Sequence, residues 1–252
     1  MNKVSNDDAL TLVAVGALVP IVASLAHEAL GHGVGCAIDG GRITLLTFLV
    51  FRCAGAGPIA DGGGPVGAFV VGCVALAILA AGKPRSAVLK LFLLTLGGMA
   101  LLWVWAQMVR EAIDGSDDWG HVAADLAWPA RWHLIACAIG VIGYVVTVRV
   151  IGRMAGPLTG GHPMRLLIPY LVATASAVAL GALWHGARAG SALDGLLSFG
   201  VAPLGYLLAL RRPTRGADVA GTIERNIVLL SCVAVLWTLF ALTIARGVGR
   251  LA

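Results

Sequence analysis

The sequence predicts an all-α polytopic membrane protein of six to seven transmembrane helices, with a short β-like or re-entrant segment after the first helix. Of its 252 residues, 59% are hydrophobic and only 12% are charged, whereas a soluble domain is about half apolar and a quarter charged. Apolar runs of about 20 residues, enough to cross a hydrocarbon core roughly 30 Å thick, recur along the chain. They leave no room for a sizeable soluble domain, so residues 1–252 are interpreted as one integral membrane domain.

Seven spans account for these apolar runs. The predicted spans are 9–37, 65–82, 87–110, 132–153, 165–187, 195–211 and 226–246. The run that starts at Ala9 is longer than a signal-peptide core and continues into His27 and Glu28, so we expect a retained first span. The sixth run contains three glycines and a proline, which leaves six spans as the alternative.

The stretch 40–64, between the first two spans, is rich in glycine at both ends. Its middle, 43–51, is β-branched and aromatic but too short to cross the membrane as a helix. It is therefore predicted to be a hairpin or a re-entrant segment. Irregular backbone survives at membrane depth only when it is buried in protein or lines a wet cavity.

The charged residues predict an orientation. If the N-terminus and the loops 83–86, 154–164 and 212–225 share one side, that side collects eleven of the eighteen Lys and Arg but only four acids. Basic loops stay in the cytoplasm, so the acidic loop 111–131 should face outward. This asymmetry explains the net charge of +5 without a nucleic-acid partner. We expect a multi-pass protein of the cell (inner) membrane whose partner is the lipid bilayer.

The five cysteines lie far apart and form no C-x-x-C pair. We interpret them as small buried hydrophobic side chains: Cys36, Cys53, Cys73, Cys137 and Cys232.

The first span contains the sequence HEALGHG, in which His27, Glu28 and His32 are the polar residues. Two imidazoles and a carboxylate are costly inside an apolar span and indicate a functional site. Two neutral imidazoles can bind Zn²⁺, and a neighbouring glutamate can accept a proton from a water that the metal activates. The alternatives are a hydrogen-bonded cluster for packing or proton relay, and an inactive remnant of a metal site.

The two histidines are five residues apart, whereas the usual zinc-hydrolase motif H-E-x-x-H places them four apart. On a regular α-helix, five steps leave the two side chains roughly 140° apart, too far to share one ion. A π-bulge adds one residue to a turn and restores a common face. Gly31, Gly33 and Gly35 make the backbone permissive. The spacing therefore predicts a distorted helix at 28–33.

A third metal ligand should come from an acid on the outward side. Asp118 is the first candidate and Asp194 the second, followed by Asp61, with His185 in reserve. Each acid could instead cap a helix or be solvated. The other histidines are expected at the surface, at an interface or on the opposite side: His121, His133 and His162.

The stretch 27–33, followed by Gly-Pro-Ile-Ala at 57–60 before a second span, resembles the site-2 protease family of intramembrane zinc metalloproteases. That family has an H-E-x-x-H helix, a β-rich or re-entrant segment, a G-P-x-x-N stretch and a later D-G aspartate. The order and spacing of the first two elements agree across roughly 15–82. The chain also resembles uncharacterised membrane relatives of that family, which carry a G-D-W-like loop (here 117–119) before an Arg-Trp pair (here 131–132).

The chain departs from the family at three points. The histidines are one residue further apart, and Asp61 stands where the family commonly has Asn. The family usually directs the metal end of its first helix toward the cytoplasm, whereas the charges here direct it outward.

The resemblance implies a membrane-embedded zinc-dependent hydrolase, an intramembrane metallopeptidase acting on a membrane-protein or peptide substrate. His27, His32 and Asp118 (next Asp194) would hold the zinc, with iron or another divalent metal left open. Glu28 would be the general base, accepting a proton from metal-activated water and passing it to the leaving amine. Water would enter through a polar cavity beneath the segment 40–64.

Other functional classes remain open. A transporter or channel could use broken glycine-rich helices with an intramembrane His/Glu ion or proton site. A non-haem iron enzyme acting on lipid would use the same ligand types. The chain could also be a catalytically inactive relative of the peptidases.

Overall fold

The computed structural model describes residues 7–82, 84, 86–160, 162–211 and 222–249. Within these residues, seven helical stretches are long and apolar enough to cross a membrane. They are Ala9–Ile38, Pro58–Ala80, Ala87–Asp114, Trp132–Thr159, Met164–Gly181, Arg188–Ala209 and Ile227–Arg246. The predicted fold class, an all-α polytopic membrane protein, is confirmed, and the sixth stretch favours seven spans over six.

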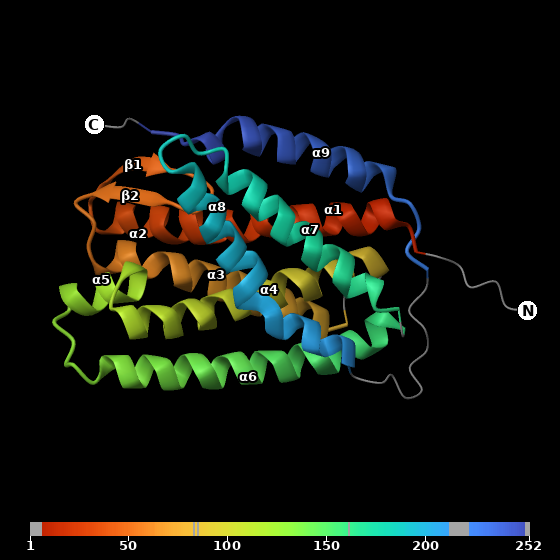
Figure 1. Ribbon diagram of the computed structural model, residues 1–252, viewed down its shortest axis with the longest axis horizontal. Coiled ribbons are helices and arrows are strands. Elements are labelled where there is room, and N and C mark those ends of the chain that lie inside the picture. The colour runs from red at the N-terminus through yellow and green to blue at the C-terminus, as the bar shows by residue number, and fades with distance from the viewer. Residues whose placement is uncertain (1–6, 83, 85, 161, 212–221, 250–252) are drawn as a thin grey trace, which may run out of the picture.

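The elements follow one another in chain order (Figure 1). The first half contains α1 (Ala9–Ser24), the π-helix η1 (Leu25–His32), α2 (Gly33–Ile38), β1 (Arg42–Leu46), β2 (Phe51–Ala54), α3 (Pro58–Ala80), α4 (Ala87–Asp114) and α5 (Asp117–Asp125). The second half contains α6 (Trp132–Thr159), α7 (Met164–Gly181), α8 (Arg188–Leu196), the π-helix η2 (Leu197–Val201), the 3₁₀ segment η3 (Ala202–Arg211), α9 (Ile227–Leu242) and η4 (Ile244–Arg246).

Several helix ends differ from the predicted spans. The fourth span ends at Thr159 instead of 153, the fifth ends at Gly181 instead of 187, and the sixth begins at Arg188 instead of 195. Two further differences have a clear local cause. The second span begins at Pro58 instead of 65, because proline suits the first helical turn, where its missing N–H has no intrahelical partner. The third span extends to Asp114 and ends there because Gly115 adopts φ +69°. The predicted irregular segment 40–64 therefore shrinks to the hairpin and its flanking turns.

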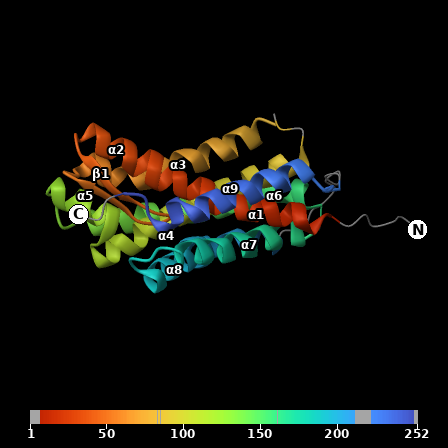
Figure 2. The same cartoon turned by 90° about the horizontal axis from the view of Figure 1, so that it is seen from above.

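The helices α1 and α4 occupy the centre of the bundle. α4 contacts α1, α3, α6 and η3, and α1 also packs against α7 and α9. Figure 2 shows α3 on one flank and α7 with α8 on the opposite flank. The outer helices α6 and α9 expose many Leu, Ile and Val side chains. Such surfaces suit contact with lipid.

The loops gather at two opposite ends of the bundle. The start of α1 lies at one end, with the start of α9 and the α6–α7 connection, while the hairpin and α5 lie at the other (Figure 1). At the first end, Asp8 links the start of α1 to the segment before α9, since its N–H donates to the Ile223 carbonyl at 2.8 Å. The acidic segment around α5 is therefore at the end of the bundle away from the basic loops.

The segment after α2 forms an antiparallel hairpin, so the predicted hairpin is confirmed. β1 pairs with β2 with an irregularity between Ile43 and Leu45, and the Thr47 hydroxyl accepts the Val50 N–H at the turn. The outer side of β1 is closed by the C-terminal segment, because Leu46 and Val248 exchange two backbone hydrogen bonds of 2.8 Å.

The interpretation of all five cysteines as isolated hydrophobic side chains was wrong for two of them. Cys36, on α2, and Cys53, on β2, form a disulfide. A Cβ on Gly41 would overlap the Cys53 sulfur, so the glycine at this position leaves room for the bond. Sequence reasoning missed the pair because only the return of the hairpin toward α2 brings the two thiols together. Cys73, Cys137 and Cys232 are free, but Cys73 and Cys232 are exposed and Cys137 is half-buried, so the expectation that they are buried was also wrong.

Candidate metal centre

The prediction of a distorted helix around 28–33 is confirmed. Residues Leu25–His32 form a π-helix inside the first span. The wider turn places His27 and His32 on the same face, with their ring centroids 4.8 Å apart. Both imidazoles are buried, at 3% and 7% exposure. The five-residue spacing therefore brings the two rings together.

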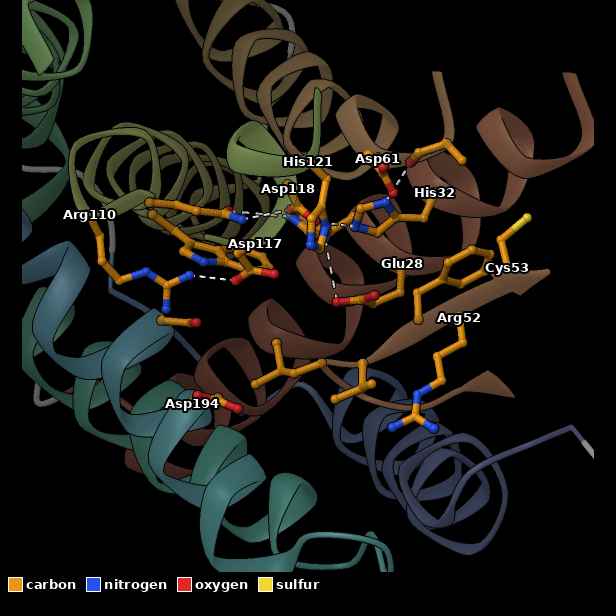
Figure 3. Close-up of a pocket in the computed structure, with 18 of the residues that line it drawn as sticks. Glu28, His32, Arg52, Cys53, Asp61, Arg110, Asp117, Asp118, His121 and Asp194 are labelled. Atoms are coloured by element: carbon orange, nitrogen blue, oxygen red, sulfur yellow. Dashed lines mark hydrogen bonds and ion pairs between the residues drawn. The ribbon is translucent and has the colours of Figure 1, made fainter. Parts of the chain in front are cut away.

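Asp118 completes a cluster with the two histidines (Figure 3). Its two carboxylate oxygens lie 3.4 Å from His27 Nε2 and 3.3 Å from His32 Nε2. One donor atom from each of the three residues lies within 4.8 Å of the others. Burial raises the pKa of the Asp118 carboxyl, but its contacts with His32 and His27 outweigh that effect and hold the pKa below its usual value.

The His32 ring is held by a backbone carbonyl. Its Nδ1 lies 2.7 Å from the Ala60 carbonyl oxygen, which can only accept, so Nδ1 donates its proton there and Nε2 is the ring nitrogen that faces Asp118. Ala60 is itself held in place, because the Asp39 carboxylate accepts from the N–H groups of Gly57 and Ala60 at 3.0 and 2.7 Å. Asp39 thus caps the start of α3 from outside that helix. Metal-ligating histidines are commonly oriented by such a second partner.

α4 positions Asp118 with two polar side chains that the sequence analysis did not consider for the site. Gln107 donates to Asp118 Oδ2 at 2.7 Å, and Glu111, which is fully buried, accepts the Trp119 N–H at 2.7 Å. Glu111 thereby satisfies an N–H in the first turn of α5. The signal was available in the sequence, since Gln107 and Glu111 are polar residues four apart, hence on one face, in an apolar helix.

Aromatic rings and glycines pack closely around the cluster. Trp103 stacks on His27 with centroids 4.6 Å apart, and Phe51 of β2 stacks on His32 at 5.4 Å. α3 approaches from the other side through Gly64, where an added Cβ would overlap both imidazole rings. The glycine run at 62–64 therefore lets α3 lie against the π-helix.

The cluster lines a cavity of about 750 Å³ at the hairpin end of the bundle. Glu28, which is 4% exposed, also lines it, and its carboxylate lies 3.4 Å from His27 Nδ1. That Nδ1 has no hydrogen-bond partner among the described residues. The other polar lining residues are Thr44, Arg52, Asp61, Gln107, Arg110, Asp117, His121, Asp194 and Ser198.

The other candidate ligands do not join the cluster. Asp194 and Asp61 line the cavity but are absent from the group formed by the two histidines and Asp118. His185 lies within 2.6 Å of Arg188 instead. His121 is exposed as predicted, yet it also lines the cavity, which the sequence analysis did not anticipate.

The remaining two histidines lie away from the cluster. His133 contacts the Ala112 carbonyl at the helix interface of α4 and α6, in line with its interpretation as a surface or interface residue. His162 lies in the α6–α7 connection at the opposite end of the bundle, as expected (Figure 1).

A second group of acids, Glu111, Asp117 and Asp118, also lies close together. The Arg110 guanidinium contacts Asp117 at 2.5 Å and Glu111 at 3.2 Å. This single cation contacts both carboxylates, so the arrangement includes an ion-pair network beside the histidine cluster.

The donor set fits a catalytic zinc ion. Two imidazole nitrogens and one carboxylate oxygen are the ligands of one known class of zinc hydrolase site, which keeps a fourth position open. The nitrogen–oxygen separations of 3.3 and 3.4 Å, each to a different oxygen of Asp118, are close to the edge of roughly 3.3 Å of a tetrahedron with bonds near 2 Å, and one donor atom of each residue lies within 4.8 Å of the others. The ligand role of His27, His32 and Asp118 stays a prediction. No family model, curated protein or solved structure matches the chain.

Proposed function

We propose that this chain is a membrane-embedded, zinc-dependent hydrolase, an intramembrane metallopeptidase similar to the site-2 proteases, with Glu28 as general base. The observation that carries the proposal is the π-helical turn that brings His27 and His32 to the carboxylate of Asp118. On a regular α-helix, two histidines five residues apart would point too far apart to bind one ion. The wider π-helical turn brings them to one face.

Each side chain would have a separate task. His27, His32 and Asp118 would hold the ion, which when bound supplies Lewis acidity toward a scissile carbonyl and toward water. Glu28 would accept the proton of the attacking water and deliver it to the leaving amine. Gln107 would keep the Asp118 carboxylate turned toward the two imidazoles. The stacked rings of Trp103 and Phe51 would limit water to the cavity side.

The hairpin favours a peptide as substrate. β2 bonds to β1 on one side, and no other strand pairs with β2 within the described residues. Residues 51–54 line the cavity beside the cluster. An extended peptide that adds to a strand edge gains main-chain hydrogen bonds irrespective of its sequence. A cleavable chain could thus be aligned along the wall that carries Phe51.

Metal content tests the ligand set first. We expect the purified full-length chain to hold one zinc per molecule by elemental analysis, and His32→Ala and Asp118→Ala to lose it. His185→Ala is the matched control, because His185 lies outside the cluster and should leave the metal in place. Equal zinc in the wild type and in His32→Ala would overturn the site.

Hydrolysis tests the role of Glu28. With a quenched-fluorescent transmembrane peptide library in detergent, Glu28→Gln should retain zinc yet lose cleavage by roughly 10²–10⁴-fold, the contribution of general acid–base catalysis. Full cleavage by this variant would eliminate Glu28 as the base.

Transport is the competing proposal, and the sixth span favours it. That span changes from α8 to the π-helix η2 and then kinks at Pro203, and Leu197, Ser198 and Val201 of η2 line the cavity. Broken helices of this kind form ion sites in transporters. Proton or cation flux into liposomes that persists after zinc removal would support transport and count against the hydrolase.

A further inference from the structure

The disulfide is next to the candidate metal centre. Cys36 belongs to the continuation of the helix that carries His32, and Cys53 lies on β2 among the residues that line the cavity. Phe51, two residues before Cys53 on the same strand, stacks on the His32 ring. The covalent bond therefore ties the wall of the cavity to the helix that presents the histidine.

A disulfide carries information about the compartment that it faces. Such bonds form and persist in oxidising compartments and are rare in the cytosol. Forming this one removes two electrons and two protons from the Cys36 and Cys53 thiols and passes them to a disulfide oxidant of the same compartment. The end of the bundle that holds the hairpin should therefore face away from the cytoplasm.

The charge distribution leads to the same orientation by different physics. The opposite end contains the start of α1 and the α6–α7 connection, and the side of the membrane that the sequence assigns to these segments collects eleven of the eighteen Lys and Arg residues. Basic loops are retained in the cytoplasm during insertion, whereas the oxidation of thiols depends on the redox poise of a compartment. Two independent properties thus assign the same side to the cavity.

We propose that the metal centre opens to the extracytoplasmic, oxidising side of the membrane, and that the Cys36–Cys53 bond formed there clamps β2 and Phe51 against His32. This inference deepens the proposed function and rests on it for the substrate. The substrate class is then the extracytoplasmic juxtamembrane segment of a membrane protein. Cytoplasmic segments end at the other face of the bundle and do not reach the cavity.

Cysteine labelling in intact cells tests the orientation without any assay of hydrolysis. In the tested proteins, the free cysteines are first replaced by Ala (Cys73, Cys137 and Cys232). One variant then adds Ala130→Cys near α5, and its matched control adds Ala81→Cys at the end of α3. Both positions are exposed. A membrane-impermeant maleimide should label position 130 in intact cells and position 81 only after permeabilisation. The reverse pattern would overturn the proposed orientation.

The redox state of the pair tests the clamp. In cells that express the chain with Cys73, Cys137 and Cys232 replaced by Ala, a polyethylene glycol maleimide should fail to shift the protein through Cys36 and Cys53 until a reductant is added. Free thiols at both positions would overturn the clamp. A double Cys36→Ala, Cys53→Ala variant should lose zinc at least 10-fold faster to a chelator than wild type, while Cys73→Ala should not. Equal rates would show that the bond does not support the site.

These readouts separate the two proposals. If the chain holds zinc but does not cleave peptides, the labelling and redox experiments still test the orientation and the disulfide, because neither depends on hydrolysis. If position 81 is labelled from outside, the orientation is wrong even for an active peptidase.

Discussion

Gly64 controls how closely α3 can approach the two imidazoles. An added Cβ at this position would overlap two ring atoms at the centre of the cluster, His32 Nε2 and His27 Cε1. The neighbouring Gly62 has a different environment, since a Cβ there would meet Val122 at 3.4 Å, an ordinary contact. One added methyl group is therefore tolerated at one glycine and not at the other.

We expect Gly64→Ala to weaken zinc binding by about 10–100-fold, the range seen when groups that orient metal ligands are changed. Overpacking should also lower the free energy of unfolding by roughly 1–3 kcal/mol. Gly62→Ala should bind zinc like the wild type. Competition with a chromophoric chelator measures both variants, and an unaffected Gly64→Ala would show that α3 does not press on the imidazoles.

Residue chemistry also explains which ligands could be named in advance. His27, Glu28 and His32 are polar residues in an apolar run, and their cost in lipid marks them out. Asp118 was the first of several loop acids considered as the third ligand, ahead of Asp194, and it is Asp118 that lies beside the two histidines. Only its contact with Gln107, eleven positions earlier on another helix, orients it toward the histidines.

At the scale of elements, the site depends on the ends of helices. Asp39 follows α2 and accepts N–H groups from Gly57 and Ala60, at the start of α3. The Ala60 carbonyl then receives the His32 Nδ1 proton. Ala60 thus links the cap of α3 by Asp39 to the ring orientation of His32, the candidate ligand on the π-helix.

Asp39→Ala should remove this cap and lower the free energy of unfolding by about 0.5–2 kcal/mol. Asp39→Asn retains the accepting oxygen and should recover most of the loss. Thermal unfolding followed by tryptophan fluorescence in detergent compares the three proteins. If Asn is as harmful as Ala, the negative charge matters more than the hydrogen bonds.

The π-helix is the element that local sequence predicts best. Two histidines five apart can share a face only if one turn is widened, so the requirement follows from helix geometry alone. The hairpin was also predictable from its β-branched residues. Its disulfide was not, because pairing depends on where the strand returns and neither cysteine has a local signal.

At the scale of the whole molecule, an ion pair closes the end opposite the cavity. Asp7, before α1, accepts two hydrogen bonds of 2.7 Å from the Arg165 guanidinium at the start of α7. It also accepts the Ile223 N–H at 3.0 Å from the segment before α9. Three distant parts of the chain are thereby joined by one carboxylate.

Burial raises the pKa of Asp7, but the hydrogen bonds from Arg165 and Ile223 outweigh it and lower the pKa below its usual value. A carboxyl with a lowered folded-state pKa adds stability above the unfolded pKa of about 4, and this stability is lost as the pH falls through the folded value. Asp7→Asn should therefore reduce the unfolding temperature at pH 7, and its difference from wild type should shrink as the pH is lowered below about 4. Unfolding curves across this range in detergent measure it, and a constant difference would exclude the pair as the cause.

The sequence by itself determined the membrane class, the spans and the need for a widened turn at the two histidines. These depend on apolar length and helical period, which are local properties of the chain. The tertiary structure decided that Asp118 and not Asp194 meets the imidazoles, that Gln107 and Ala60 orient the cluster, and that Cys36 bonds Cys53. Contacts between residues far apart in sequence are set by how the spans pack, and that packing leaves no periodic trace in the sequence.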